Sequence, residues 1–424
     1  MGAPADGRRA AVAVFASWLA LVQIIVSARR PDPDDGGRGS DAERPAIISV
    51  SRTRLARYAR LTPKPKRGRE AAFAGKKSGK PLFPLVKEPV TRQVPAKSIM
   101  RQAMTFKPPA PTPPGLWRRV PPAIFPSIMG LFDLGLAWRR GADVFVLPRG
   151  IAETILGAVA LLFVFAVLAY AVKLLRRPSV IVDELRILPG RAGVATMVLS
   201  IYLLSMTLAP YSAVVGQAIL ISGLSIHAAL VVLLVHQFVT GPAEQRRVTP
   251  IWHLSYVGFI FGALAATVFE FYLLALVLFI ATTLVAGLIW SVSLEQVIKE
   301  TVPAPLRPLL AIHLSPVALI GLVAAALELD AVAMGCAGIA AMMLAALVLR
   351  GAWLTQAGFS ALWGAFTFPL AATANLWLTV GGVWRWPGGI ALVAATLIVP
   401  MIAFKVVRLW AGGQLAVKTN AAVA

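Results

Sequence analysis

The sequence predicts an all-α membrane protein: ten transmembrane helices, arranged as five helical hairpins around a central pore, follow a disordered basic N-terminal tail. Hydrophobic residues make up 58% of the 424 residues and charged residues only 14%, with a mean hydropathy of +0.75. Soluble proteins carry about a quarter charged residues, so this composition indicates a membrane protein. Apolar stretches long enough to cross a bilayer recur from residue 120 onward. Very short and longer polar breaks alternate between them, and this alternation predicts hairpins.

The N-terminal residues 1–115 are predicted to be the tail. Residues 1–103 hold 21 Lys/Arg and 8 Asp/Glu, a net charge of +13 out of +22 for the chain. Their mixed polar composition and repeated prolines argue against a folded domain. The tail is either inert or binds anionic lipid headgroups. Nucleic acid is not an expected partner, because the basic clusters of the tail are not interleaved with aromatic residues that would stack on bases. An alternative interpretation is that translation starts at Met100 or Met104, so that the residues before it do not belong to the natural protein.

An apolar run at residues 10–28 has three interpretations: a signal sequence cleaved after Ala28, an eleventh span, or an incidental segment. Export of this run would put the start of the first span outside the cell and invert every later loop. The charges of those loops favour the opposite orientation, so we expect the tail to stay inside.

The ten expected spans are close to the roughly 20 residues that a helix needs to cross the hydrocarbon. They form a predicted channel or transporter domain at 116–410, before a short C-terminal tail at 411–424. The spans lie at 120–138, 150–175, 191–209, 212–239, 250–269, 271–293, 308–327, 331–349, 358–381 and 388–409.

Lysine and arginine set the expected orientation. The breaks after the even-numbered spans and the C-terminal end, with the adjoining span ends, hold 13 of them, and the breaks after the odd-numbered spans hold 4. Cytoplasmic loops carry the excess of basic residues. Both termini are therefore predicted to be cytoplasmic.

Prolines indicate which spans line the pore. Pro126, Pro316 and Pro369 fall inside the first, seventh and ninth spans, whereas the second, fourth, sixth and eighth have none in their interiors. Helices broken in this way are tolerated where they face a cavity. The alternative is that proline is simply commoner in membrane helices. We expect the three prolines, with the neighbouring Ser315 and Thr367, to line the pore.

The ninth span holds the predicted gate. Its apolar run at 358–381 carries no charged residue, and Pro369 interrupts its helical hydrogen bonding. Phe368, beside this break, is expected to project its ring into the pore and occlude it. Gly130, Gly258 and Gly262 either leave room for a solute here or let helices approach closely.

Asp133 is unusual, because a carboxylate in a membrane span is costly and commonly functional. It is expected either to couple transport to protons or to pair near the outer surface with Arg139 or Arg140. His253 and His313 either tune the electrostatics of the pore or form ordinary interior hydrogen bonds. The spans contain few cations, so an anion would depend on the positive ends of helices.

Enzyme chemistry is not expected. The four histidines show no metal-ligand spacing, Cys336 is the lone cysteine, and no phosphate-binding loop or nucleophile motif is present. We therefore predict no metal and no cofactor.

Four segments together resemble one family. They are FPSIMGLFDLGLAWRR at 125–140, VTPIWHLSYVGF at 248–259, PLRPLLAIHLSPVALIG at 305–321 and WGAFTFPLAA at 363–372. They are similar to helices one, five, seven and nine of the tellurite-resistance/dicarboxylate transporter family, which includes bacterial TehA-type proteins and the slow-type anion channels of plant guard cells. The resemblance covers about residues 116–410.

The resemblance implies a homotrimer in the bacterial inner membrane, each subunit with its own pore lined by the odd-numbered helices. A phenylalanine of helix nine occludes that pore in the family, and the matching residue is Phe368. Mid-span prolines are missing here from helices three and five, and Asp133 is a further departure, which puts pore width and anion preference in doubt.

We therefore expect an anion channel or channel-like transporter for inorganic or organic anions, gated by Phe368. Tellurite and C4-dicarboxylates are the substrates that the family name suggests. The alternative is a proton-coupled exporter of organic acids or oxyanions, with Asp133 titrating. A third possibility is a membrane scaffold whose basic tail recruits a partner or lipid.

Overall fold

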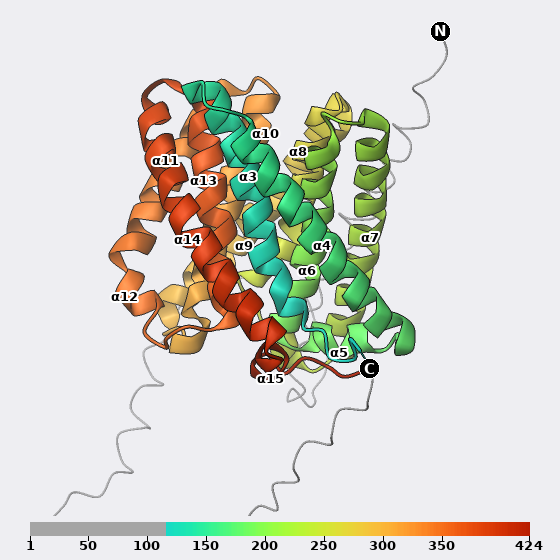
Figure 1. Ribbon diagram of the computed structural model, residues 1–424. Coiled ribbons are helices and arrows are strands. Elements are labelled where there is room, and N and C mark those ends of the chain that lie inside the picture. The colour runs from blue at the N-terminus through green and yellow to red at the C-terminus, as the bar shows by residue number, and fades with distance from the viewer. Residues whose placement is uncertain (1–115) are drawn as a thin grey trace, which may run out of the picture. The chain divides into compact units, whose positions relative to one another are not determined.

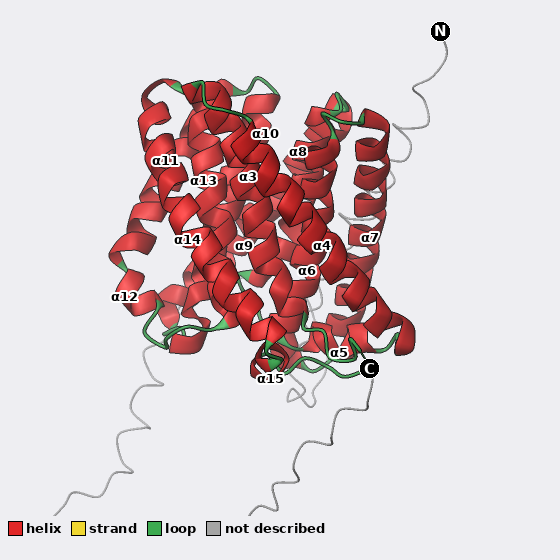
Figure 2. Ribbon diagram, viewed as in Figure 1, coloured by secondary structure: helices red, strands yellow, loops and turns green. Residues whose placement is uncertain are grey.

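A computed structural model describes residues 116–424 of the chain, and the tail predicted at 1–115 lies outside these described residues. All regular secondary structure in residues 116–424 is helical, as the colouring of Figure 2 shows. The all-α prediction is therefore confirmed for this part of the chain.

The described part contains α-helices of 4 to 28 residues. They are α3 (Phe125–Phe145), α4 (Gly150–Arg176), α5 (Val180–Arg186), α6 (Leu188–Leu208), α7 (Ala213–Thr240), α8 (Phe259–Val268), α9 (Tyr272–Lys299), α10 (Leu314–Ala326), α11 (Asp330–Leu349), α12 (Gly351–Leu354), α13 (Thr367–Val380), α14 (Arg385–Ala411) and α15 (Gln414–Lys418). Short helices of other types are η2 (Pro122–Ile124), η3 (Ala243–Arg246), η4 (His253–Val257), η5 (Ala304–His313), η6 (Ala361–Phe366) and η7 (Gly382–Trp384).

Each of the ten expected spans overlaps one of these helices, and seven helical segments of the described part are long and apolar enough to cross a membrane, with η5 and α10 counted as one segment and η7 and α14 as another. The other three are α3, which carries two aspartates and two arginines, α8, and α13, which has only 14 residues. The structure thus supports a multi-pass membrane protein, while the crossing of the bilayer by all ten stays a prediction.

Five helices form an inner ring (Figure 1). Helix α3 contacts α6, α6 contacts α8, α8 contacts α10, α10 contacts α13, and α13 contacts α3. Helices α4, α7, α9, α11 and α14 pack outside this ring, each against the inner helix that precedes it in the chain or, for α14, against α13 and α3. The most apolar stretches of α6 and α10 are 78% buried, against 22–44% for the outer helices. The apolar outward faces of the outer helices suit contact with lipid.

The breaks that carry most of the basic residues lie together at one end of the ring. Helices α5, α12 and α15, which belong to these breaks and to the C-terminal segment, lie at the lower end in Figure 1, as does the C-terminus. We call this the basic end. The chain enters α3 and α6 from this end, and it enters α8, α10 and α13 from the same side through η4, η5 and η6, so the positive N-terminal ends of the inner helices point to the same side.

The prolines of the inner helices occupy the first helical turn, not the middle of a long α-helix. Pro126 is the second residue of α3, and Pro316 and Pro369 are the third residues of α10 and α13. Proline is tolerated there because the first N–H groups of a helix have no partner within it. The 3₁₀ helices η5 and η6 run up to α10 and α13, so these prolines mark a change of helix type within a span. The expectation of a kink inside one α-helix is corrected accordingly.

A buried ion pair holds the basic end together. Lys173 Nζ lies 2.5 Å from Glu184 Oε1 and also donates to the Val120 carbonyl at 2.8 Å, and both charged side chains are 0% exposed. The Ala422 N–H donates to the same Glu184 oxygen at 3.1 Å. The pair therefore connects α4, α5, the segment before α3 and the C-terminal segment.

Candidate functional site

The inner ring encloses a small cavity at its basic end. The starts of α3, α6, α10 and α13 line it with residues such as Pro126, Ala192, Ser315 and Phe368, and Leu254 of η4 completes it. Its volume of about 30 Å³ leaves room for only a few water molecules. None of its lining residues is charged. An anion here would contact apolar side chains and the positive ends of helices.

Phe368 lies on the wall of this cavity and is 1% exposed. It is the second residue of α13, directly after the 3₁₀ helix η6. Its ring packs against the ring of Phe261 from α8, with 4.9 Å between the centroids. The aromatic side chains of Phe368 on α13 and Phe261 on α8 thus contact each other at the level of the cavity.

Thr367 fixes the start of α13 against α3. Its hydroxyl donates to the Gly364 carbonyl at 2.7 Å and lies 3.2 Å from the Pro126 carbonyl. A Cβ atom added to Gly130 would come within 2.2 Å of the Thr367 hydroxyl oxygen. The glycine therefore permits the close approach that sets the position of the neighbouring Phe368.

The Gly130→Ala substitution is expected to lower protein stability by about 1–3 kcal/mol, because α3 and α13 must separate to admit the methyl group. Thermal unfolding of the purified protein in detergent measures the loss. Gly157→Ala is the matched control, since Gly157 lies in α4 with no heavy atom within 4 Å of an added Cβ. Equal melting temperatures for Gly130→Ala and Gly157→Ala would contradict the packing role.

Gly258 and Gly262 also lie at close contacts. An added Cβ would meet Leu199 Cδ2 of α6 at 2.6 Å in the first case and Leu224 Cδ2 of α7 at 3.0 Å in the second. None of the three predicted glycines lines the cavity described above, whereas Pro126, Ser315, Phe368 and Pro369 do. This geometry favours close helix packing for the glycines. Thr367 and Pro316 are buried beside the cavity without being among its lining residues.

Asp133 lies deeper in the ring. It is 3% exposed, and its Oδ2 atom has no hydrogen-bond partner among the described residues. The Asn375 side chain of α13 lies within hydrogen-bonding reach of the carboxyl group. Asn375 follows Phe368 by seven residues, which places it on the same helix face about 10 Å further from the basic end. Along the axis of the inner ring, the polar pair Asp133–Asn375 therefore lies further from the basic end than the aromatic pair Phe368–Phe261.

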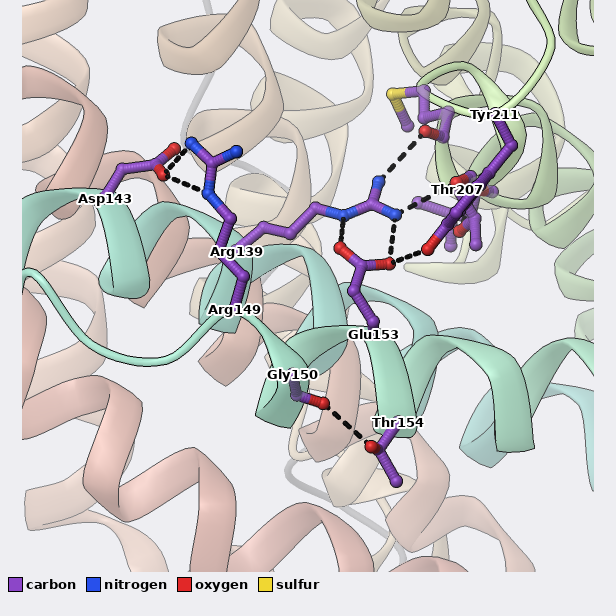
Figure 3. Close-up of polar contacts among 10 residues, drawn as sticks. Arg139, Asp143, Arg149, Gly150, Glu153, Thr154, Thr207 and Tyr211 are labelled. Carbon is purple, nitrogen blue, oxygen red and sulfur yellow. Dashed lines mark hydrogen bonds and ion pairs between the residues drawn. The ribbon is translucent and has the colours of Figure 1, made fainter.

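Arg139 does not pair with Asp133. Its guanidinium binds Glu153 of α4 through two contacts of 2.7 Å, as Figure 3 shows. It also donates to the carbonyls of Met206 at 3.3 Å and Thr207 at 3.0 Å, which are orphan acceptors in the last turn of α6. The expectation of an Asp133–Arg139 pair is wrong, because Glu153 on the next helix offers a bidentate partner.

Tyr211 completes this cluster by donating its hydroxyl hydrogen to Glu153 at 2.7 Å (Figure 3). Arg149 pairs with Asp143 beside it, with 2.8 Å between the closest atoms. These contacts tie α3, α4 and the end of α6 together at the end of the ring opposite the basic end.

The two predicted histidines contact each other. His253 Nε2 lies 3.0 Å from His313 Nδ1, and Trp290 Nε1 donates to the His313 carbonyl at 3.3 Å. The pair joins η4 to η5 and is held by α9. This arrangement favours interior hydrogen bonding, while a role in pore electrostatics stays a prediction.

Sequence reasoning missed Phe261, the partner of Phe368. It lies between the glycines of the GFIFG run at 258–262, so its place in a small-residue segment was the available signal. No group of three His, Cys, Asp or Glu side chains in residues 116–424 is arranged to hold a metal ion.

Comparison with known proteins gives one family. The model of the family described as "voltage-dependent anion channel" matches residues 119–410, more than half of the chain. A search of the curated proteins gives no match. The matched range includes α3 through nearly all of α14, and so both the inner ring and the outer helices.

Proposed function

We infer the function from the premise that this chain belongs to the voltage-dependent anion channel family, which its residues 119–410 match. The protein is a membrane protein of an anion channel or transporter kind. We propose that ten helices cross the bilayer and that anions pass passively along the axis of the inner ring of each subunit, with Phe368 as the gate.

One observation carries this proposal. The ring of Phe368 lies at the wall of the cavity that the starts of α3, α6, α10 and α13 line, and it packs against the ring of Phe261. Anions would collect at the basic end through the excess of Lys/Arg in its loops. Uncharged walls and helix ends bind an anion weakly, which suits fast passage. Rotation of the Phe368 ring away from Phe261 would open the path.

Further features of the proposal follow from the resemblance and the charges. We expect a homotrimer in a bacterial inner membrane, with the basic end and both termini in the cytoplasm. Chloride and nitrate are the first anions to test, and tellurite and C4-dicarboxylates are further candidate substrates.

Reconstitution of the full chain in liposomes tests the proposal. A potassium-valinomycin potential should drive chloride across the membrane without any pH gradient, slowly for the wild type and faster for Phe368→Ala. Absence of protein-dependent flux in both would count against a passive pore.

The alternative is a proton-coupled exporter that uses Asp133. The observation that favours it is a carboxyl group inside the ring with an oxygen that has no partner among the described residues. In an exporter, a pH gradient alone should drive anion movement.

For the passive channel, Asp133→Asn is expected to change anion flux less than about threefold, because the amide keeps the shape and the hydrogen bond to Asn375 without a net charge. A pH gradient imposed at zero membrane potential should leave flux unchanged for both proteins. Asp143→Asn, at a half-exposed site near the C-terminal end of α3, is the matched control. Flux that follows the pH gradient in the wild type and loses this dependence in Asp133→Asn would establish the exporter instead.

A further inference from the structure

We propose that the protein has a second binding site, a pocket beside the entrance of the pore that takes an organic anion with an apolar body and regulates conduction. The regulatory part of this proposal rests on the proposed channel function, while the binding part does not. The site is formed where α5 ends, α6 begins, and the segment before η4 meets α9 and η5.

The pocket has a volume of about 430 Å³, within the range of small-molecule sites. It opens at the basic end and is separate from the cavity next to Phe368. The two share only Leu309 of η5, and neighbouring residues of α6 face them, Arg191 the pocket and Ala192 the cavity. The first turn of α6 and η5 thus form a thin wall between them.

Arg191 is the principal residue of the site. It is 4% exposed, yet none of the ion pairs among the described residues includes it. Its Nε donates to the Leu185 carbonyl at 3.0 Å, and its guanidinium lies 4.8 Å from the centre of the Phe238 ring. These two contacts hold the guanidinium in place and leave the Nη groups for a ligand. A buried cation normally has an anionic partner.

Other donors surround the same space. Ser293 of α9 is 6% exposed, and its hydroxyl has no hydrogen-bond partner among the described residues, nor has that of Thr249. Arg247, which pairs with Glu300, and Arg186, which lies 3.6 Å from Asp183, also line the pocket. Hydroxyl and guanidinium donors together suit the oxygens of a phosphate or carboxylate group.

The remaining walls define the rest of the ligand. They are mostly apolar and include Leu188, Val297, Leu306 and Leu310. A bare inorganic anion would leave these walls without contact. A phosphate or carboxylate head on an alkyl or aromatic body fills both parts of the pocket. Such a molecule can be a soluble organic phosphate or an anionic phospholipid of the surrounding membrane.

Occupancy would act on the pore through the shared wall. A ligand held by Arg191 and Ser293 fixes the first turn of α6 relative to α9. Leu309 of η5 lines both the pocket and the cavity next to Phe368. Binding that favours one arrangement of these elements shifts the equilibrium between closed and open pores. The ligand is thus a regulator and not the permeant ion.

Binding is tested first, without any transport assay. The full-chain protein in detergent is titrated calorimetrically with butyl phosphate, and inorganic phosphate and butanol serve as probes of the head and body alone. Butyl phosphate should bind at least about tenfold more tightly than either, because only it satisfies both parts of the pocket. Arg191→Gln should weaken butyl phosphate binding at least about tenfold. Arg140→Gln, an exposed arginine at the opposite end of the ring, should leave it unchanged.

Ser293→Ala is a second variant of the site, which keeps the test valid if Arg191→Gln does not fold. Melting curves show whether each variant is folded. Its removal of one hydroxyl should weaken butyl phosphate several-fold. No binding of butyl phosphate by folded wild type, or equal binding by wild type and both folded variants, would overturn the site.

Flux measurements test separately whether the ligand is a lipid or a soluble molecule and whether it regulates the pore. Phosphatidic acid added to phosphatidylcholine liposomes should change the anion flux of the wild type and not that of Arg191→Gln if a lipid is the ligand, whereas butyl phosphate should do so if the ligand is soluble. If butyl phosphate binding depends on Arg191 but neither phosphatidic acid nor butyl phosphate changes the anion flux, the regulatory role is overturned and the binding site stands. Absence of any flux would count against the channel and leave the binding result standing.

Discussion

Anion conductance is expected to rise roughly ten- to hundredfold when Phe368 is replaced by alanine. Burial of a phenylalanine side chain contributes about 1.5–3 kcal/mol, so rotation of the ring out of its contact with Phe261 opposes opening by a similar amount. Alanine removes this barrier and leaves the backbone of α13 in place. Currents through planar bilayers that contain the full-chain protein measure the change.

Phe163→Ala is the matched control for this experiment. Phe163 is buried on the outer helix α4, where its ring packs against those of Phe125 and Phe132. Its loss is expected to lower stability without opening the pore. Unchanged currents in folded Phe368→Ala, or an equal rise in Phe163→Ala, would contradict the assignment of the gate.

Lys173→Met is expected to lower stability by about 3–5 kcal/mol, because it leaves the Glu184 carboxylate buried with a single backbone N–H as its partner. Replacing both residues by apolar ones should restore most of the loss. Thermal and chemical unfolding in detergent at neutral pH measures both variants.

The loss should depend on pH in a defined direction. Burial raises the pKa of Glu184 above its ordinary value of 4.5. Without Lys173 the neutral carboxyl form is favoured further, and a raised pKa in the folded state makes stability fall as pH rises. Lys173→Met should therefore be less destabilising near pH 4.5 than at pH 8.

An exposed pair provides the comparison for this prediction. Lys299 and Glu295 lie 2.5 Å apart with side chains 67% and 61% exposed. Surface pairs of this kind contribute about 0–1 kcal/mol. A loss for Lys173→Met no larger than that for Lys299→Met would contradict the structural role of the buried pair.

The ten spans predicted from the sequence each overlap a helix of the described part, but neither the short helices α5, α12 and α15 nor the type of helix within each span was predicted. Hydropathy reports which residues avoid water, and it is the same for a 3₁₀ and an α segment. The run at 358–381 was therefore expected to be one broken helix, whereas η6 ends at Phe366 and α13 begins at Thr367. Pro369 correctly indicated that the hydrogen bonding changes near this point.

Side-chain partners across helices were beyond sequence reasoning. Arg139 is six residues from Asp133 and was an obvious partner for it, but Glu153 reaches Arg139 from α4. Arg191 was visible only as one of the basic residues that set orientation. Its burial against Phe238, without a carboxylate partner among residues 116–424, depends on how α5, α6 and α7 pack, which no local pattern reports.

The reversal potential of Phe368→Ala currents tests the central claim most directly. With a tenfold potassium chloride gradient across a planar bilayer, a passive anion pore should reverse near the chloride equilibrium potential, about 59 mV in magnitude. A pH gradient added at symmetrical chloride should leave the reversal at zero. Reversal near the potassium potential, or a reversal that moves with the pH gradient, would contradict a passive anion pore gated by Phe368.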